Sequence, residues 1–168
     1  MIKVQRYFLD IKYGEHTTKN IKLPDGIKIY LEKDKNFKLN KFFYKHVGFE
    51  HYWRDRLVWS DQEWEGYVSN PNFQTWILKK NNDLVGFYEQ EFHPETNEVE
   101  LINLGILKEY RNMKLGAFLL SHAIKNSFEI KPKRMWVHTC SLDHKNALDN
   151  YKARGFKIFK QEEINFVA

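Results

Sequence analysis

The chain has 168 residues, which is enough for one domain with a sizeable core and leaves no length for a second. Hydrophobic residues make up 42% and aromatic residues 16%, which excludes a disordered chain despite 29% charged residues. The formal net charge of +5 favours an anionic partner, but the lysines are scattered, and no dense Lys/Arg block predicts a nucleic-acid arm. We therefore expect a single domain over residues 1–168 that does not bind nucleic acid.

The single cysteine, Cys140, excludes an internal disulfide and any cysteine-cluster metal site. Such cysteine usage fits the reducing cytoplasm. No apolar run approaches the roughly 20 residues of a membrane span, and charged residues alternate with aromatic ones at the N-terminus. The sequence thus predicts a soluble, unprocessed cytoplasmic protein with no membrane partner and no metal.

Residues 1–26 are expected to form an N-terminal extension made of a strand and a loop. Val4–Tyr13 is rich in aromatic and branched residues, as strands are, and a Pro-Asp-Gly turn marks residues 14–26 as a loop. Ile27–Glu32 alternates as a second strand.

Two helices are expected next. Apolar residues within 39–47 recur at helical spacing, and Gly48 ends that helix. Ser60 and Glu63 form a capping-box pair that begins a second helix, which an Asn-Pro pair ends. The aromatic and charged segment 49–59 connects the two.

Three strands over residues 73–80, 84–92 and 98–106 are separated by short turns and predict an antiparallel meander. A helix from about Met113 to Phe128 then leads to a strand over Met135–Cys140. Because a helical crossover precedes it, this strand should run parallel to the strand before the helix.

A last helix is expected after Asp143, which can cap it, and Gly155 would end it. Phe156–Phe166 closes the chain as a strand. The order of these elements predicts an α/β fold.

The stretch from Leu104 to Leu120 joins a strand to a helix through a short basic loop. The first N–H groups of such a helix lack intrahelical partners and carry the positive end of the helix dipole, so a phosphate can bind there. Arg111 and Lys114 add positive charge, and Gly116 removes a side chain where a diphosphate could approach the backbone. The stretch predicts a site for a diphosphate-containing cofactor.

A known pyrophosphate signature consists of Arg or Gln, any two residues, Gly, any one residue, and then Gly or Ala. Arg111 and Gly116 match its two ends. Lys114 stands where the inner glycine is usual. Proteins with this signature also share a later pattern of Asn, Ala, Tyr and Gly-Phe. Here it is matched by Asn146, Ala147, Tyr151, Gly155 and Phe156. Together the two motifs resemble the GCN5-related N-acetyltransferase (GNAT) family.

The resemblance implies an α/β fold with a mixed, mostly antiparallel central sheet of about seven strands flanked by about four helices. It also implies acetyl-CoA as the cofactor. Backbone groups of Leu104, Gly105, Ile106 and Leu107 would bind the pantetheine arm. The diphosphate and the remainder of the cofactor would lie against Arg111, Asn112, Met113, Lys114, Leu115, Gly116, Ala117 and Asn146.

Two residues are candidates for proton transfer. The family's histone acetyltransferases place a glutamate at the position of Glu100 to deprotonate the amine, which is needed because a lysine-like amine has a pKa of about 10.4. Tyr151 matches the family tyrosine that donates a proton to the departing sulfur, and phenols and thiols have comparable pKa values, about 10 and about 8.5. The alternatives are an exposed strand residue for Glu100 and a packing aromatic for Tyr151.

Trp53, Arg54, Asp55 and Arg56 fall in the segment that overhangs the acceptor side in this fold. An arginine beside an aromatic wall suits a carboxylate, and Asp55 suits an amine, so these four residues are expected to bind the acceptor. The alternative is a structural Asp55–Arg56 pair with the tryptophans in the core.

His138 and Cys140 share one face of their strand. His138 is expected either to contact the acceptor or to be a satisfied core histidine. Cys140 is expected to be a small buried residue rather than a nucleophile. The segments Trp53–Arg56 and His138–His144 further resemble a bacterial branch of the family.

The function implied is direct acetyl transfer from acetyl-CoA to the amine of a small molecule, by a monomer or a homodimer. A non-catalytic acyl-CoA-binding module and a protein-lysine or N-terminal acetyltransferase remain alternatives. A protein acceptor would call for an open groove, whereas the aromatic segment 49–59 favours an enclosed pocket.

Overall fold

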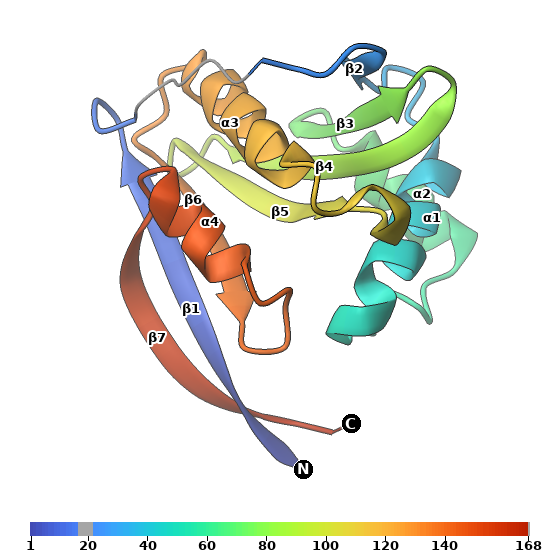
Figure 1. Cartoon of the computed structure of the whole chain (residues 1–168). Helices are drawn as coiled ribbons and strands as arrows, with labels where there is room; N and C mark the ends of the chain where they lie inside the picture. The colour runs from blue at the N-terminus through green and yellow to red at the C-terminus, as the bar shows by residue number, and fades with distance from the viewer. Residues whose placement is uncertain (17–21, 168) are drawn as a thin grey trace.

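The structure, a computed structural model, describes residues 1–16 and 22–167. Each predicted helix and strand is present (Figure 1). The elements are β1 (Ile2–Lys12), β2 (Ile27–Leu31), α1 (Phe37–Gly48), η1 (Phe49–His51), α2 (Asp61–Ser69), β3 (Phe73–Lys80), β4 (Asp83–His93), β5 (Glu98–Ile106), η2 (Lys108–Tyr110), α3 (Leu115–Phe128), β6 (Arg134–Cys140), α4 (Ala147–Ala153) and β7 (Lys157–Phe166).

The seven strands form one sheet in the order β2-β3-β4-β5-β6-β1-β7. Neighbouring strands are antiparallel except β5 and β6, which pair in parallel. The helical crossover through α3 separates these two strands, as expected for a parallel pair. The predicted α/β fold with a mixed, mostly antiparallel sheet is confirmed.

Strand β1 does not lie at the edge of the sheet but between β6 and β7. Arg6 is opposite Cys140 on one side and opposite Glu162 on the other. The chain termini therefore meet along one long hairpin-like pair, with N and C close together in Figure 1. This placement brings the N-terminal strand beside the strand that carries His138 and Cys140.

Helices cover the two faces of the sheet unequally. The larger core joins α3 and α4 to one face, through buried residues such as Leu119 and Tyr151 packed with Leu9 and Leu101. The smaller core joins α1 to the other face, where Phe43 stacks on Phe87 with ring centroids 4.7 Å apart. Figure 1 shows α3 and α4 in front of the sheet and α1 and α2 at the end where β3 and β4 lie.

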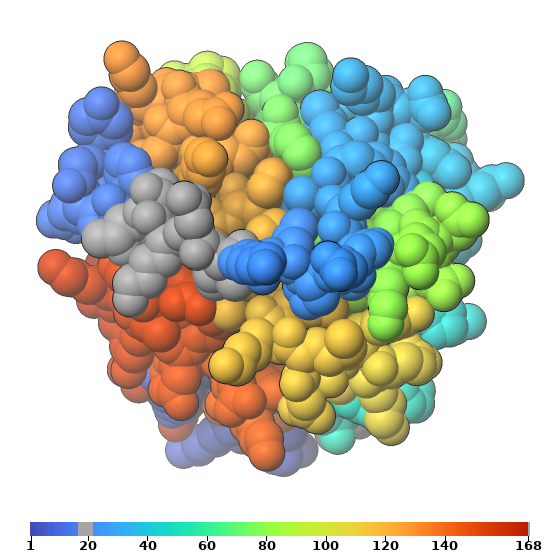
Figure 2. Space-filling model, turned by 45° about the horizontal axis from the view of Figure 1, so that its top comes forward, coloured from blue at the N-terminus to red at the C-terminus, as the bar shows by residue number. Residues whose placement is uncertain are grey.

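The edge strand β2 is fixed to the β3–β4 hairpin by regular pairing and by a turn contact. The N–H of Asn81 donates to the carbonyl oxygen of Gly26 over 2.8 Å. Figure 2 shows the blue segment that leads into β2 beside this green hairpin. In residues 1–16 and 22–167, no helix is both long and apolar enough to cross a bilayer.

Two helix starts are informative. The capping box at Ser60 and Glu63 is confirmed in both directions. The prediction that Asp143 caps the last helix is wrong, because α4 begins at Ala147 and has Asn146 as its N-cap. The carboxylate of Asp143 instead accepts hydrogen bonds from the end of β6 and from Trp53.

Candidate active site

Strands β5 and β6 pair only over their first residues, Glu98–Leu101 with Arg134–Val137. Beyond this point β5 stays with β4 as far as Ile106, while β6 stays with β1. The β4–β5 register shifts between Glu89 and Gln90, at the same level. The two strands thus diverge, and the facing edge of each keeps backbone groups that make no bond to the other.

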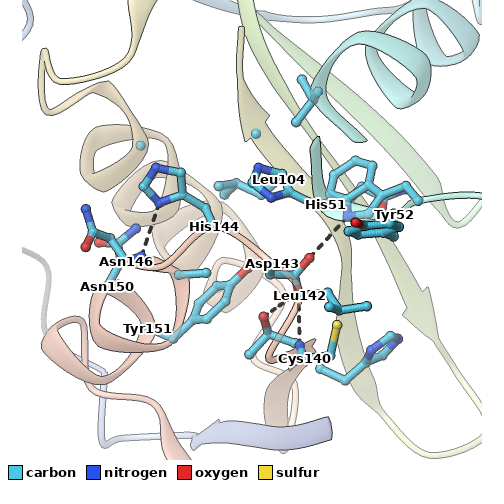
Figure 3. Close-up of a pocket in the computed structure, with 18 of the residues that line it drawn as sticks. His51, Tyr52, Leu104, Cys140, Leu142, Asp143, His144, Asn146, Asn150 and Tyr151 are labelled. Carbon is cyan, nitrogen blue, oxygen red and sulfur yellow. Dashed lines mark hydrogen bonds between the residues drawn. The ribbon is translucent and has the colours of Figure 1, made fainter. Parts of the chain in front are cut away.

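A cleft of about 1010 Å³ opens where the strands diverge. Seventeen of the predicted site residues line it: Glu100, Tyr151, Leu104, Gly105, Ile106, Arg111, Asn112, Lys114, Leu115, Gly116, Ala117, Asn146, Trp53, Arg54, Asp55, Arg56 and His138. Leu107 is buried in the smaller core and Met113 is exposed, so neither side chain lines the cleft. Figure 3 shows part of its wall, with Tyr151 on one side and His51 and Tyr52 on the other.

The loop before α3 has an unusual backbone. Asn112 and Lys114 take φ angles of 68° and 61°, in the left-handed region that favours glycine. Lys114 is the N-cap of α3, makes no side-chain cap hydrogen bond, and is followed by a first turn without acidic residues. The backbone conformation therefore gives a physical reason why a glycine is usual at the position of Lys114.

Lys114→Gly is expected to raise the free energy of unfolding by about 1 kcal/mol, because glycine takes a positive φ without steric cost. We also expect it to weaken CoA binding by about tenfold, through loss of one charge-assisted contact to phosphate. Denaturant unfolding and calorimetric titration with CoA measure the two effects.

Lys131→Gly is the matched control, because Lys131 also has a positive φ, 55°, but follows the end of α3 away from the cleft. It should stabilise the protein similarly without changing the affinity for CoA. Unchanged or tighter CoA binding by Lys114→Gly would remove the ammonium group from phosphate binding.

The guanidinium of Arg111 is already paired in the cleft wall. It donates to a carboxylate oxygen of Glu50 over 2.6 Å and to the carbonyl oxygen of Ile106 over 3.3 Å. Hydrogen bonds from Arg111 and then from Lys108 lower the pKa of Glu50. Glu50 therefore fixes the direction of Arg111 and neutralises part of its charge.

Two glycines near this loop serve different purposes. A Cβ atom at Gly105 would lie 2.2 Å from Cγ1 of Val47, so only glycine lets α1 pack this close to β5. Among the described residues a Cβ at Gly116 would meet only Ile106, at 4.0 Å, which leaves space beside the first turn of α3. The uncapped helix start, the open space at Gly116 and the charge of Lys114 fit a diphosphate group.

Tyr151 lies in α4, and its ring packs edge-on against Phe156 with centroids 5.6 Å apart. Burial, and then the negative charge of Asp143, raise the pKa of Tyr151 well above its usual value. The hydroxyl is therefore protonated at every physiological pH. It can donate a hydrogen bond into the cleft, but full proton release is harder than for a free phenol.

Glu100 lies on β5, and one of its carboxylate oxygens is 3.0 Å from Nε2 of His93. When Nε2 carries a proton, it donates a hydrogen bond to this oxygen. Burial alone lowers the pKa of His93, but Glu100, Glu91 and Glu95 outweigh burial, and the pKa is raised. Glu100 is thus a carboxylate in the cleft wall that the His93 imidazole holds from behind.

The turn after β6 is organised by Asp143. One oxygen of its carboxylate accepts from the Thr139 hydroxyl over 2.5 Å and from the Cys140 N–H over 3.0 Å. The other accepts from the indole N–H of Trp53 over 3.2 Å, across the cleft. Figure 3 shows Asp143 between Tyr151 and Tyr52, with Cys140 close to its carboxylate.

The comparison with family models matches residues 29–156 to the acetyltransferase (GNAT) family. The chain belongs to the GNAT family. A search of curated proteins finds no match. The matched range contains the diverging strands, the loop before α3 and Tyr151, so most of the cleft wall lies within the GNAT part of the chain.

Solved structures similar to this chain include a GCN5-related N-acetyltransferase from Kribbella flavida, with a TM-score of 0.66, 14% identity and coverage of 94% of this chain and 55% of that one. An aminoglycoside acetyltransferase from an uncultured soil metagenomic sample, in complex with trehalose, has a TM-score of 0.66 and 12% identity, over 80% and 90% of the two chains. The ribosomal-protein-S18-alanine N-acetyltransferase from Escherichia coli has a TM-score of 0.60 and 17% identity, over 78% and 77%. At these identities the likeness shows the fold, and this chain spans little more than half the length of the Kribbella protein.

A buried carboxylate that the sequence analysis missed lies beneath the GNAT cleft. Glu89 is 1% exposed, and its oxygens accept from the amides of Asn40 and Asn103 over 2.6 and 2.7 Å and from the Tyr67 hydroxyl over 3.1 Å. A guanidinium nitrogen of Arg56 lies 3.8 Å away. The available signal was a glutamate directly after the apolar run Leu84–Tyr88 in β4.

This contact changes the interpretation of Arg56. Its guanidinium lies over the rings of Tyr67, Trp59 and Tyr44, at 4.4, 4.9 and 5.7 Å. Among the described residues its ion pair is with Glu89, so the alternative Asp55–Arg56 pair is not formed. Arg56 therefore anchors segment 49–59 to the sheet and also lines the cleft.

His138 and Cys140 both line the GNAT cleft, on the β6 wall. Burial, and then the charge of Arg6, lower the pKa of His138, which favours the neutral imidazole. Burial, and then the charge of Asp143, raise the pKa of the Cys140 thiol. A protonated thiol is a poor nucleophile, as expected for Cys140, but its side chain is half-buried in the cleft wall and not fully buried as predicted.

Further residues line the cleft that the sequence analysis did not assign to it. Those on the two long terminal strands are Val4, Arg6, Ile164, Asn165 and Phe166, and those in the loops include His51, Tyr52, Leu142, Asp143 and His144. The loop residues lay inside segments that the sequence patterns had singled out. The strand residues had no local signal, because only the pairing of β1 between β6 and β7 brings them here.

Proposed function

We propose that the protein is an acetyl-CoA-dependent N-acetyltransferase that transfers the acetyl group directly to the amine of a small molecule. The observation that carries the proposal is the cleft between the diverging strands β5 and β6, which lies against the start of α3 and has Glu100 and Tyr151 in its wall. We also propose that residues 1–168 act as one domain with residues 1–26 as its extension, in the cytoplasm, as a monomer or homodimer, without nucleic-acid or membrane partners.

The cofactor would lie along the β5 side of the cleft. Unpaired backbone groups from Leu104 to Ile106 suit the amides of a pantetheine arm, and the N–H groups at the start of α3 with Lys114 suit the diphosphate. When bound, acetyl-CoA supplies an acyl group activated as a thioester. Asn146, at the start of α4, would contact the cofactor from the other wall of the cleft.

Glu100 would take the proton that the acceptor ammonium must lose before it attacks. Its hydrogen bond with His93 holds the carboxylate in place, and the raised pKa of His93 keeps a positive charge beside it up to higher pH than usual. The carboxylate is therefore held in the wall of the cleft, where an acceptor ammonium could reach it.

The Tyr151 hydroxyl would donate a hydrogen bond to the sulfur as negative charge develops on it. Its raised pKa ensures that the proton is present, and stabilisation by a hydrogen bond needs no complete transfer. This refines the expectation from reference pKa values, in which phenol and thiol were nearly matched.

The contacts over the cleft support a small acceptor. Among the structural relatives, one is an aminoglycoside acetyltransferase and another is a ribosomal-protein-S18-alanine N-acetyltransferase, so both small and protein acceptors occur on this fold. Here segment 49–56 reaches over the cleft to Asp143 and Phe166. We infer that an acceptor enters a covered pocket rather than an open groove.

A thiol-release assay with acetyl-CoA and a panel of amines tests the proposal, with mass spectrometry of the products. We expect amine-dependent release of CoA and a product heavier by one acetyl group. CoA binding without release for any small amine, peptide or protein would indicate a non-catalytic acyl-CoA-binding module. Transfer to peptides alone would replace the small acceptor with a protein one.

Glu100→Gln is expected to lower the rate about 100-fold at low pH and progressively less as pH rises. The base is needed most where the neutral amine is scarcest, so the loss should shrink as the solution itself deprotonates the amine. A pH–rate profile of the variant measures this. A profile parallel to that of wild type would argue against Glu100 as the base.

A further inference from the structure

Segment 49–56 touches the opposite wall of the cleft at three places. The indole N–H of Trp53 donates to Asp143, the rings of His51 and His144 meet edge to face with centroids 5.9 Å apart, and the ring of Tyr52 meets Phe166 at 5.7 Å. These partners belong to the β6–α4 turn and to β7. The segment is therefore a bridge between the two walls that diverge at β5 and β6.

The near end of this bridge is rigidly seated. The backbone N–H of Trp53 donates to the carbonyl oxygen of Gly48 over 3.2 Å, and a Cβ at Gly48 would lie 2.4 Å from Cβ of Trp53. Tyr52 takes a φ of 59°, which turns the chain sharply between them. The indole is thus held against the end of α1 and aimed across the cleft.

The far end is equally fixed. Asp143 uses one carboxylate oxygen for the Thr139 hydroxyl and the Cys140 N–H, so its carboxylate is immobile relative to the end of β6. The other oxygen is directed at Trp53. A hydrogen bond to a carboxylate is stronger than one between neutral groups. The bond therefore joins two rigid parts of the molecule.

We propose that Asp143 is a positioning residue, which through its hydrogen bond with Trp53 holds segment 49–56 over the cleft and so places the acceptor. The functional part of this inference rests on the proposed acetyl transfer. Arg54 shows what the bridge positions: its guanidinium lies over the rings of Tyr52 and Phe166, at 4.9 and 5.7 Å. Arg54 and Asp55 follow Trp53 directly, so loosening the indole would displace both.

Trp53→Phe tests the bridge because it removes the N–H and keeps an aromatic ring against Gly48. Trp59→Phe is the matched control: Trp59 lies in the same connection but packs on Trp64 and Tyr67 rather than lining the cleft. Amide hydrogen exchange without any ligand follows peptides covering residues 49–56 and 139–146. We expect Trp53→Phe to speed exchange about tenfold in both peptides, and Trp59→Phe to leave residues 139–146 at the wild-type rate.

Asp143→Asn is the second variant. It weakens the same hydrogen bond at its acceptor, so it should speed amide exchange in residues 49–56. Wild-type exchange in residues 139–146 of Trp53→Phe, or in residues 49–56 of Asp143→Asn, would overturn the bridge. This readout is independent of acetyl transfer, so it stands even if no amine accepts an acetyl group.

Steady-state kinetics test the placement of the acceptor. In Trp53→Phe we expect KM for the amine to rise about tenfold, with kcat and the Kd for CoA within about twofold of wild type. An unchanged KM, or an equal loss in Trp59→Phe, would overturn the positioning role. Absence of amine-dependent turnover in wild type would instead overturn the proposed function.

Discussion

Tyr151→Phe is expected to lower kcat by about 100-fold while the Kd for acetyl-CoA stays within about twofold of wild type. The variant removes a hydroxyl that burial and the charge of Asp143 keep protonated. It leaves the ring packing on Phe156 and the fold of α4 in place. The lost interaction is one that strengthens only as charge develops on the departing sulfur, so the loss should appear in kcat rather than in binding.

Single-turnover kinetics and calorimetric titration measure these two quantities. Tyr30→Phe is a suitable control, because Tyr30 lies on β2 at the far edge of the sheet. It should change neither quantity. If Tyr151→Phe turns over at the wild-type rate when chemistry limits, Tyr151 has only a packing role.

Glu89→Gln is expected to lower the free energy of unfolding by about 3 kcal/mol. The carboxylate of Glu89 receives bonds from Asn40, Asn103 and Tyr67 and faces the Arg56 guanidinium. An amide of the same shape offers one acceptor oxygen and turns its NH₂ group toward other donors, which leaves a buried charge on Arg56 unbalanced.

Urea unfolding of the two proteins measures the difference. Glu65→Gln removes an exposed glutamate from α2 and should change stability by less than about 0.5 kcal/mol. The double replacement of Glu89 by Leu and Arg56 by Met should recover part of the loss, because it removes both charges. A Glu89→Gln protein as stable as wild type would mean that Glu89 is protonated and uncharged in the folded state.

Local patterns predicted much of this fold because their causes are local. The capping box at Ser60 and Glu63 and the end of α1 at Gly48 follow from nearby residues alone. The parallel pairing of β5 with β6 followed from the helical crossover between them. The loop before α3 was found for the same reason, since its charges and its helix are adjacent in sequence.

The features that the sequence left open depend on contacts between distant segments. Asp143 is a residue type suited to helix capping, but its carboxylate instead accepts hydrogen bonds from the end of β6 and from Trp53. The position of β1 between β6 and β7, which brings Arg6 into the cleft, depends on pairing between the two ends of the chain. The partner of Glu89 could not be read from spacing, since Arg56 precedes it by two secondary-structure elements.

Lys114 illustrates how the two kinds of information combine. The sequence marks it as a departure from the family signature, and the backbone gives the reason, a positive φ at the start of α3. A lysine tolerates this conformation at a cost in stability of about 1 kcal/mol. Its ammonium group lies at the start of α3, where it could form an ion pair with a bound phosphate.

A crystal structure with acetyl-CoA tests the central claim most directly. We predict the diphosphate against the N–H groups at the start of α3 and the pantetheine arm along Leu104 to Ile106. The sulfur should lie within hydrogen-bonding distance of the Tyr151 hydroxyl, and the acetyl group should face the side of the cleft that carries Glu100. A cofactor bound outside the gap between β5 and β6, or a sulfur remote from Tyr151, would contradict the account.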